Sequence, residues 1–233
     1  METSLHRQLK GLYAGAEART EEQLERYRID AVRGEELVEI QHGSLAAIRD
    51  KIGRLLQSHR VLVVKPLVAR KTLIMQDERG GEIVSRRKSP KSASFLNLFD
   101  ELVYFTRVFP HPNLTLEILL VEVEEWRYPG HGKRRRWRQN DFVTEDLRLV
   151  AVHSTRQFRT HGDLLEMLPS NLPRSFHTGH LAAGLAVQRA IAQRIAYCLR
   201  KTGAVTETGK QGNARLYQFT QPQPKRRPKA RRA

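Results

Sequence analysis

The sequence predicts an α/β protein of two domains, with a mixed sheet flanked by helices over residues 1–158 and a helical domain over 159–220. Three observations predict this organisation. Apolar runs such as LEILLVEV recur between amphipathic stretches, as expected for strands that alternate with helices. The chain opens with the order helix, strand, strand, helix, strand. Beyond about residue 158, helical patterns follow one another and then give way to a hairpin pattern that contains glycine.

The elements of the first domain follow from hydrophobic periodicity and from turn residues. Glu21 and Glu22 suit the first turn of a helix over 17–27, because negative charge is favoured at a helix N-terminus. Ser44 is a candidate N-cap for an amphipathic helix, and the apolar run RVLVVKPLV is typical of a strand buried on both faces. Helices are predicted at 3–13, 17–27, 44–57 and 94–107, and strands at 27–32, 37–41, 60–68, 72–77, 81–86, 114–127 and 147–158.

The second domain follows a linker near residues 158–172, and Pro169 and Pro173 belong to this region. Thr178 is the predicted cap of its second helix. Alternation around Gly209 and Gly212 predicts a β-hairpin. Helices are predicted at 161–169, 175–185 and 186–202. Residues 221–233 hold six Lys or Arg, three prolines and no acid, which indicates a disordered basic tail that contacts phosphates without sequence preference.

The charge of the chain favours a polyanionic partner. Its 41 Lys and Arg outnumber 25 Asp and Glu, so the formal net charge is +16, and nucleic acid is the simplest partner of that sign. Residues 126–138 add a basic, tryptophan-containing loop in which Arg134, Arg135 and Arg136 are candidates for phosphate contact and base stacking. The alternative is a solvated loop whose Trp rings cover the edge of the core.

Several protein classes are excluded by what the sequence contains. The single cysteine, Cys198, excludes a disulfide framework and a cysteine-based zinc site within one chain, and its apolar neighbours indicate core packing. Apolar runs stay well short of the roughly 20 residues that span a bilayer. The N-terminus also lacks a secretory signal pattern. A soluble cytoplasmic protein is therefore expected, without a membrane partner.

Two carboxylates are expected to face each other on the first hairpin. If Gly34 and Glu35 form a two-residue turn, Arg33 pairs with Glu36 and Asp30 stands opposite Glu39. Two such carboxylates would repel each other unless a divalent cation bridged them, and hard oxygen ligands suit Mg²⁺ or Mn²⁺. The alternative is a solvent-facing strand pair that nearby arginines neutralise.

The segment ID-x8-EIQHGS, in its order helix, strand, strand, helix, strand, resembles the core of PD-(D/E)XK nucleases over residues 17–68. Within that superfamily it looks like the variant with Gln in place of Lys, as in CoiA-like nucleases. The resemblance implies a restriction-endonuclease-like sheet, with Asp30 and Glu39 as metal ligands and Gln41 at the lysine position. Glu25, or else Glu22, would add a helix carboxylate. Because Gln41 is neutral, Lys51 or Lys65 would supply the missing positive charge.

The third helix of the second domain has the pattern of a DNA-reading helix. Apolar residues form one stripe, while Arg189, Gln193 and Arg200 lie broadly on the other side, where they can reach the major groove. Lys210 and Arg215 of the hairpin are candidate phosphate contacts. Residues 174–220 hold seven Lys or Arg against Glu207 alone. The segment resembles winged helix-turn-helix domains, and the alternative is a winged helix that binds protein.

Together these observations predict a metal-dependent endonuclease, with Mg²⁺ or Mn²⁺, that docks on double-stranded DNA through its C-terminal domain. The first alternative is a DNA-binding regulator without enzymatic activity on a degenerate nuclease fold, which the replacement of Lys by Gln41 motivates. The second alternative is an RNA-binding protein. Enzymes that cut both strands are commonly dimers, so a homodimer is left open.

Overall fold

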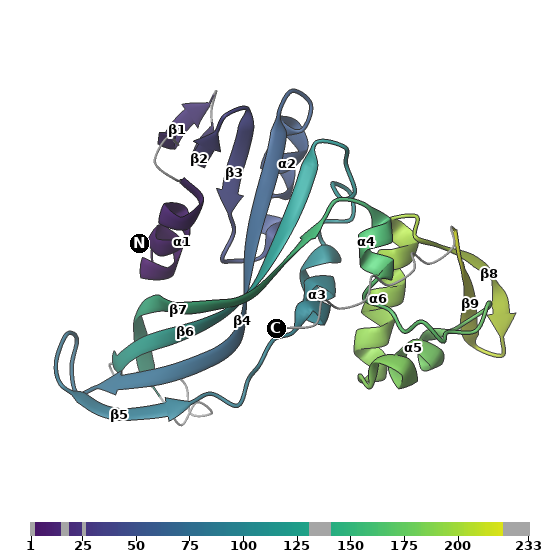
Figure 1. The fold of residues 1–233 in the computed structure, drawn as a ribbon. Helices are drawn as coiled ribbons and strands as arrows, with labels where there is room; N and C mark the ends of the chain where they lie inside the picture. The colour runs from purple at the N-terminus through teal and green to yellow at the C-terminus, as the bar shows by residue number, and fades with distance from the viewer. Residues whose placement is uncertain (1–2, 15–18, 25–26, 131–140, 221–233) are drawn as a thin grey trace, which may run out of the picture.

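A large mixed sheet with helices on both faces forms the body of the protein (Figure 1). The computed structural model describes residues 3–14, 19–24, 27–130 and 141–220. The strand order is β1-β2-β3-β4-β6-β7, and β5 pairs with β4 off this path. The strands are β1 (Arg19–Leu24), β2 (Tyr27–Arg33), β3 (Glu36–Ile40), β4 (Arg60–Gln76), β5 (Ile83–Lys88), β6 (Leu114–Pro129) and β7 (Phe142–Phe158). The predicted mixed sheet flanked by helices is confirmed.

The first hairpin has the register that the turn predicts. Ala31 pairs with Val38, and Arg33 with Glu36, on either side of the two turn residues. Gly34 takes a φ of 58°, which a residue with a side chain adopts at a cost. Strands β1, β2 and β3 are antiparallel, and β3 then runs parallel to β4 after a helical crossover.

The helix predicted over 17–27 is wrong, because residues 19–24 form strand β1. Its backbone pairs antiparallel with β2, with Glu22 opposite Ile29. Helix propensity is only a weak preference even for the Glu, Gln and Leu residues of this segment, and the open edge of β2 offers hydrogen bonds that outweigh it. Glu22 therefore lies on a strand, and Glu25 lies outside the described residues.

Helices cover both faces of the sheet, and the side chains of β4 are divided between them. On one face, α1 (Ser4–Ala14) packs Leu5 and Leu9 into an apolar cluster with Leu62 and Val64. On the other, α2 (Arg49–Leu55) belongs to a cluster that contains Val61 and Val63. The prediction that this strand is buried on both faces is confirmed.

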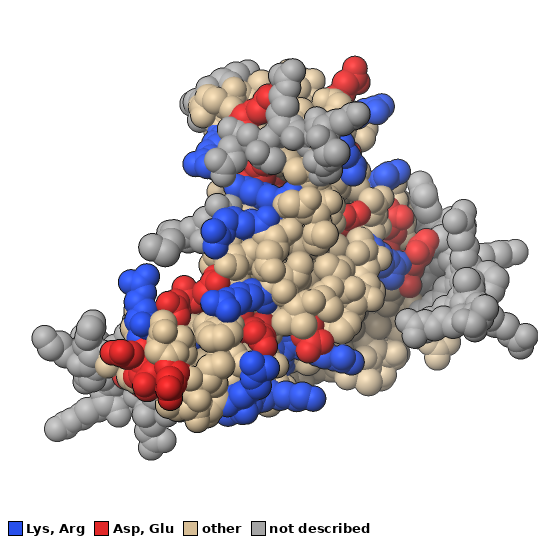
Figure 2. Space-filling view, turned by 60° about the vertical axis from the view of Figure 1, so that its left-hand side comes forward, with Lys and Arg blue, Asp and Glu red and all other residues tan. Residues whose placement is uncertain are grey.

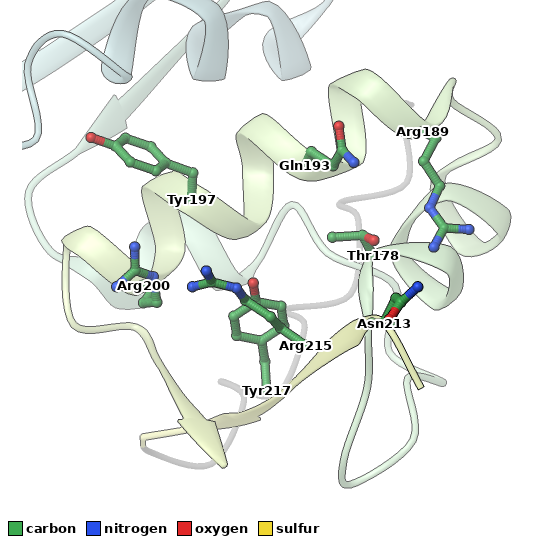
Figure 3. A pocket seen from close by; sticks show the side chains of 9 residues that line it. Thr178, Arg189, Gln193, Tyr197, Arg200, Asn213, Arg215 and Tyr217 are labelled. Carbon is green, nitrogen blue, oxygen red and sulfur yellow. The ribbon is translucent and has the colours of Figure 1, made fainter. Parts of the chain in front are cut away.

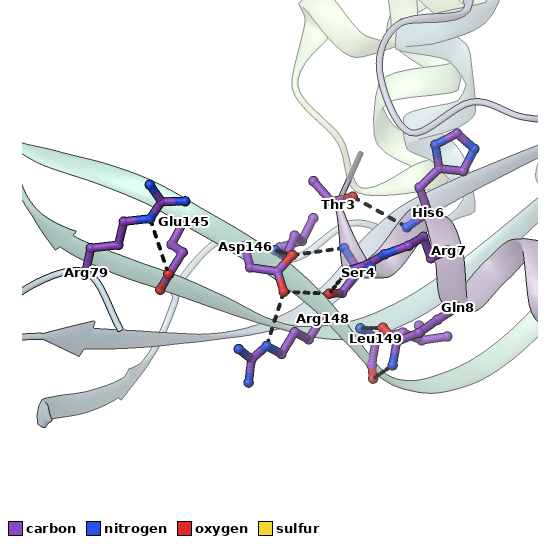
Figure 4. Close-up of polar contacts among 11 residues, drawn as sticks. Thr3, Ser4, His6, Arg7, Gln8, Arg79, Glu145, Asp146, Arg148 and Leu149 are labelled. Atoms are coloured by element: carbon purple, nitrogen blue, oxygen red, sulfur yellow. Dashed lines mark hydrogen bonds and ion pairs between the residues drawn. The ribbon is translucent and has the colours of Figure 1, made fainter. Parts of the chain in front are cut away.

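The helix α1 is fastened to the sheet at its first turn (Figure 4). Asp146 on β7 accepts hydrogen bonds from the backbone N–H of Ser4 at 2.9 Å and from its hydroxyl at 2.6 Å. One turn later, the side chain of Gln8 accepts a bond from the N–H of Leu149 at 2.8 Å. A carboxylate at this position satisfies an N–H that has no partner within the helix.

The second halves of β4 and β6 and the first half of β7, together with β5, extend beyond the helices as an arm (Figure 1). The pairing of β4 with β6 shifts register between Val68 and Arg70, and such irregularities bend strands. The predicted strands at 60–68 and 72–77 are thus two halves of one strand. On the face seen in Figure 2, basic and acidic side chains lie interspersed over the lower part of the molecule.

The remaining helices of the body and the C-terminal elements lie where the periodicity predicts them. The 3-10 helix η1 (Leu45–Ala47) precedes α2, and the side chain of Ser44 caps it. The 3-10 helix η2 (Phe95–Asn97) precedes α3 (Leu98–Leu102). The C-terminal elements are α4 (His161–Leu165), α5 (Thr178–Leu185), α6 (Arg189–Lys201), β8 (Val205–Gln211) and β9 (Ala214–Phe219).

The cap predicted for α5 is off by one residue. His177 precedes the helix in an extended conformation, and its ring Nδ1 accepts the backbone N–H of Gly179 at 2.9 Å. Thr178 is already the first helical residue, so its hydroxyl does not occupy the capping position.

The C-terminal helices share one apolar cluster with the body of the protein. Phe99 and Leu102 of α3 are fully buried in the same cluster as Ile195 and Leu199 of α6. Cys198 is buried there too, with its Sγ 3.6 Å from the carbonyl oxygen of Phe99, so its predicted core position is confirmed. No helix in the described ranges is long and apolar enough to cross a membrane.

Candidate functional site

A groove with a volume of about 380 Å³ lies between α6 and the β8–β9 hairpin (Figure 3). Four of the residues singled out from the sequence, Arg189, Gln193, Arg200 and Arg215, meet in it. The groove is lined by Thr178, Arg189, Gln193, Tyr197, Arg200, Asn213, Ala214, Arg215 and Tyr217.

The amphipathic pattern of α6 explains which side chains face the groove. Its 13 residues bury Ile195 and Leu199 against α3 and α5. Positions spaced by three or four residues fall on one side of a helix. The series Arg189, Gln193 and Tyr197 is therefore exposed on the opposite side.

The hairpin supplies the opposite wall of the groove. Arg215 and Tyr217 extend from β9 toward α6 (Figure 3). Tyr217 is buried, and its backbone pairs with that of Phe176 through hydrogen bonds of 2.9 and 2.7 Å. The fifth predicted contact, Lys210, is exposed on β8 and does not line the groove.

The lining of the groove carries three guanidinium groups and no carboxylate. Arg215 donates a hydrogen bond to Glu207 at 3.0 Å. Within the described residues, Arg189 and Arg200 form no ion pair with a carboxylate. The groove therefore keeps a positive surplus that can attract an anion.

A stacked histidine pair lies at the end of the groove near Arg189. The rings of His177 and His180 have centroids 3.9 Å apart at an interplanar angle of 12°. Loss of hydration, followed by the positive charges of His180 and Arg189, lowers the pKa of His177. Its Nδ1 is thus available to accept the N–H bonds that cap α5, which helps to position Thr178 at the groove.

The carboxylates of Asp30 and Glu39 bind to different helices. Asp30 lies 3.3 Å from both Lys10 and His6 of α1. Glu39 lies 2.7 Å from Lys51 of α2. Since α1 and α2 cover opposite faces of the sheet, the two carboxylates have separate cationic partners.

The pKa values of Asp30 and Glu39 are shifted in opposite directions. Burial would raise the pKa of Asp30, but hydrogen bonds from His6 and from the Ile40 N–H, with the charge of Lys10, hold it below the ordinary value. Burial raises the pKa of Glu39 above its ordinary value, and the Lys51 contact offsets this only in part. The charge of Asp30 also raises the pKa of Glu39, so the two groups are close enough to interact.

The other residues of the predicted nuclease centre have structural partners. The side chain of Gln41 donates to the carbonyl oxygen of Ser44 at 2.9 Å. Lys65 is buried and lies 3.3 Å from Glu101, so of the two cations considered only Lys51 lies beside Glu39. Among the residues that the structure describes, no group of three or more His, Cys, Asp or Glu could hold a metal ion. Glu25 and Arg134, Arg135 and Arg136 lie outside these residues.

Comparison with known proteins shows the family of this chain. A family model described as Domain of unknown function (DUF8091) matches residues 3–159. The chain belongs to the DUF8091 family. The DUF8091 match ends one residue after β7, so the groove at α6 follows it in sequence. An uncharacterized protein of Treponema pallidum (strain Nichols) is 33% identical over 229 residues, which is 97% of this chain and 89% of that protein. No solved structure matches the chain.

The sequence analysis did not identify several residues in the groove at α6 and beside Asp30. Tyr197 continues the spacing of Arg189 and Gln193, so the helical period was a signal that could have identified it. His6 and Lys10, the partners of Asp30, come from a helix about 20 residues earlier, and no local pattern links them to that strand.

Proposed function

We propose that this DUF8091 protein binds duplex DNA without cutting it, with α6 in the major groove and the β8–β9 hairpin against the phosphates. The observation that carries the proposal is the convergence of Arg189, Arg200 and Arg215 on one groove whose lining has no carboxylate. Gln193 lies between them on the exposed side of α6. Arg and Gln are the side chains that form paired hydrogen bonds with base edges in the major groove.

The order of the C-terminal elements supports the comparison with a winged helix. The bridge at Phe176 is followed by α5, α6 and a hairpin, and the hairpin strand β9 carries the bridge partner Tyr217. Residues 186–188 join α5 to α6, and Ala186 adopts a left-handed conformation with a φ of 52°. A turn of three or four residues between two such helices is the turn of helix-turn-helix proteins.

The roles of the side chains differ with their position. In helix-turn-helix proteins the N-terminal residues of the second helix contact base edges, which assigns base reading to Arg189 and Gln193. Arg200 lies near the C-terminal end of α6, and Arg215 and Lys210 lie on the hairpin, so these three are assigned to phosphates. Phosphate contacts set affinity, whereas base contacts set sequence preference.

A binding titration with matched variants tests the proposal. The protein is titrated into a fluorescent duplex of about two helical turns at several stated salt concentrations. Replacing Arg189 and Arg200 by Gln should weaken binding by about tenfold or more. The control replaces Arg33 and Arg49 by Gln, which removes the same charge from residues that are paired with Glu36 and Asp50. Equal loss in both variants would contradict the proposal.

The same titration separates the alternatives. Displacement of the DNA by double-stranded RNA at equal or lower concentration would favour RNA as the partner, because phosphate contact alone does not distinguish the two. Absence of binding to either nucleic acid would favour a C-terminal domain that binds protein.

Phosphodiester cleavage is a second candidate, and one observation favours it. The strand β1 replaces the helix that the nuclease resemblance implies before the Asp30 strand, but the order that follows, β2 with Asp30, β3 with Glu39, α2 and β4, agrees with the resemblance, and Lys51 lies 2.7 Å from Glu39. The donor atoms do not fit a shared ion, however, because lysines on opposite faces of the sheet occupy the two carboxylates. We therefore derive no cleavage step from these residues.

A plasmid-nicking assay with Mg²⁺ or Mn²⁺ tests the second candidate. Wild-type protein is compared with Glu39→Gln and Asp30→Asn. Cleavage by the wild type that both variants lose would establish the second candidate and contradict binding without cleavage. Intact plasmid, with DNA binding retained, is the result that the primary proposal expects.

A further inference from the structure

We propose that the segment 83–91, called here the basic strip, is a second surface that contacts the phosphate backbone of DNA. The strip comprises β5 and the residues directly after it, Ser89, Pro90 and Lys91. It lies on the arm, away from the groove at α6 (Figure 1). The inference takes duplex DNA as the partner from the proposed function, but it rests on a different set of residues.

The basic strip lies at an open edge of the sheet. β5 pairs with β4 and with no other strand in the part of the chain that the structure describes. All six of its residues are exposed. The chain then continues along β4, because the N–H of Ser89 donates to the carbonyl of Lys71 at 2.8 Å and that of Ala93 to Val68 at 3.0 Å. The backbone of the strip is therefore held in place while its side chains face solvent.

The carboxylates of β6 neutralise Arg86 but not the other cations of the strip. Glu124 on β6 accepts a bond from Arg86 at 3.2 Å. Glu125 is bound by Lys71 at 2.6 Å and also by Arg127. These contacts engage both carboxylates with cations other than Arg87, Lys88 and Lys91.

A third carboxylate, Glu122, is likewise occupied. Its Oε2 lies 2.9 Å from His153 and 3.7 Å from Arg70. Arg87, Lys88 and Lys91 thus keep no carboxylate partner among the described residues. Three surplus cations lie within five consecutive residues.

The size and chemistry of this surplus fit a nucleic acid backbone. Even a fully extended chain separates Arg87 from Lys91 by at most about 14 Å, which corresponds to the axial rise of about four base pairs of DNA. The strip contains no aromatic side chain that could stack on a base. Contact through this surface should therefore add affinity without adding sequence preference.

The competing explanation is protection of the sheet edge. Proteins place Lys and Pro on exposed edge strands to prevent pairing with other chains. Ile83 and Val84, which are 47% and 59% exposed, make such protection useful here. This explanation predicts an effect on self-association and none on DNA.

The test compares two triple variants of the full chain. The strip variant carries Arg87→Gln, Lys88→Gln and Lys91→Gln. The control carries Arg7→Gln, Arg33→Gln and Arg49→Gln, which removes the same charge from α1, β2 and α2. Affinity for a duplex of about 30 base pairs is measured from about 50 to 200 mM salt, and circular dichroism verifies folding.

The strip variant should reduce the magnitude of the negative slope of log affinity against log salt by about 2 to 3, because each lost phosphate contact removes about 0.9. The control should change the slope by less than about 1. Equal slopes for the two triples would overturn the inference. Unchanged binding with concentration-dependent aggregation of the strip variant would also overturn it, in favour of edge protection.

The result for the basic strip can be distinguished from the result for the groove at α6. If Arg189→Gln with Arg200→Gln does not change DNA binding while the strip variant reduces the magnitude of the salt slope, the groove assignment fails and the strip assignment remains. If the groove variant weakens binding while the strip variant matches its control, the strip alone is refuted.

Discussion

The ammonium group of Lys51 on α2 lies 2.7 Å from the carboxylate of Glu39 on β3, and at most 16% of either side chain is exposed. Lys51 also donates to the carbonyl oxygen of Arg28 on β2. One cation thus fastens a helix to two strands. The contact gives the carboxylate a protein partner at the point where the sequence suggested a metal ion.

Removing only one member of this pair should destabilise the fold strongly. Lys51→Met leaves Glu39 as a nearly buried carboxylate without its cation, and we expect a loss of about 3 kcal/mol in the free energy of unfolding. The double variant Glu39→Gln/Lys51→Met should lose clearly less, because no charge is left unpaired. Urea denaturation measures both. Additive losses from the two single changes would contradict a direct coupling.

The depressed pKa of Asp30 predicts a defined pH dependence of stability. A carboxyl group whose pKa is lower in the folded state than in the unfolded state stabilises the fold above its unfolded pKa of about 3.9. That contribution is lost as the pH falls through the lower, folded value. The stability difference between wild type and Asp30→Asn should therefore be fully present above about pH 5 and shrink below about pH 4.

Denaturant unfolding at closely spaced pH values checks this expectation. A difference that grows as the pH falls would show that the ionised form of Asp30 is not the one that the fold favours. Asp50→Asn serves as the control, because Arg49 also lowers the pKa of that carboxyl group but solvent screens this exposed pair, so a much smaller difference is expected.

Replacing Ala186 by Gly should stabilise the protein. Ala186 has a φ of 52° in the turn between α5 and α6, and a left-handed conformation is unfavourable for a residue with a Cβ atom. We expect a gain of up to about 1 kcal/mol, reduced by the greater freedom of glycine in the unfolded chain. Thermal unfolding measures the gain, and affinity for DNA should be unchanged. A lower melting temperature would show that the turn does not hold this conformation.

The thiol of Cys198 should be unreactive in the folded protein. Burial raises its pKa to about 12, so very little reactive thiolate exists near neutral pH. A thiol reagent at about pH 8 should modify the protein far more slowly in buffer than in denaturant. Rapid modification of the native protein would indicate that α6 separates readily from Phe99 and α3.

Local sequence predicted the features that depend on neighbouring residues. The turn at Gly34 and Glu35 fixes the register of β2 and β3, because a two-residue turn leaves only one pairing of the flanking strands. The continuous apolar run at residues 60–68 predicted that this part of β4 is buried on both faces. The helical period placed Arg189, Gln193 and Arg200 together.

The errors arose where distant segments compete for the same residues. Residues 19–24 are acidic and were predicted as helix, but pairing with β2 makes them a strand. The ion shared by Asp30 and Glu39 stays a prediction, but local patterns did not indicate the protein partners of these two carboxylates. The structure gives Asp30 the partners His6 and Lys10 from α1, and gives Glu39 the partner Lys51 from α2.

The amino-acid sequence alone determined the periodic elements, the turns and the positive charge of the chain, because each depends on residues only a few positions apart. The tertiary structure decided which charges remain available to a partner. Electrostatic pairing depends on distance in space, so only the folded chain distinguishes Lys10, which pairs with Asp30, from Arg189 and Arg200, which have no carboxylate partner among the described residues.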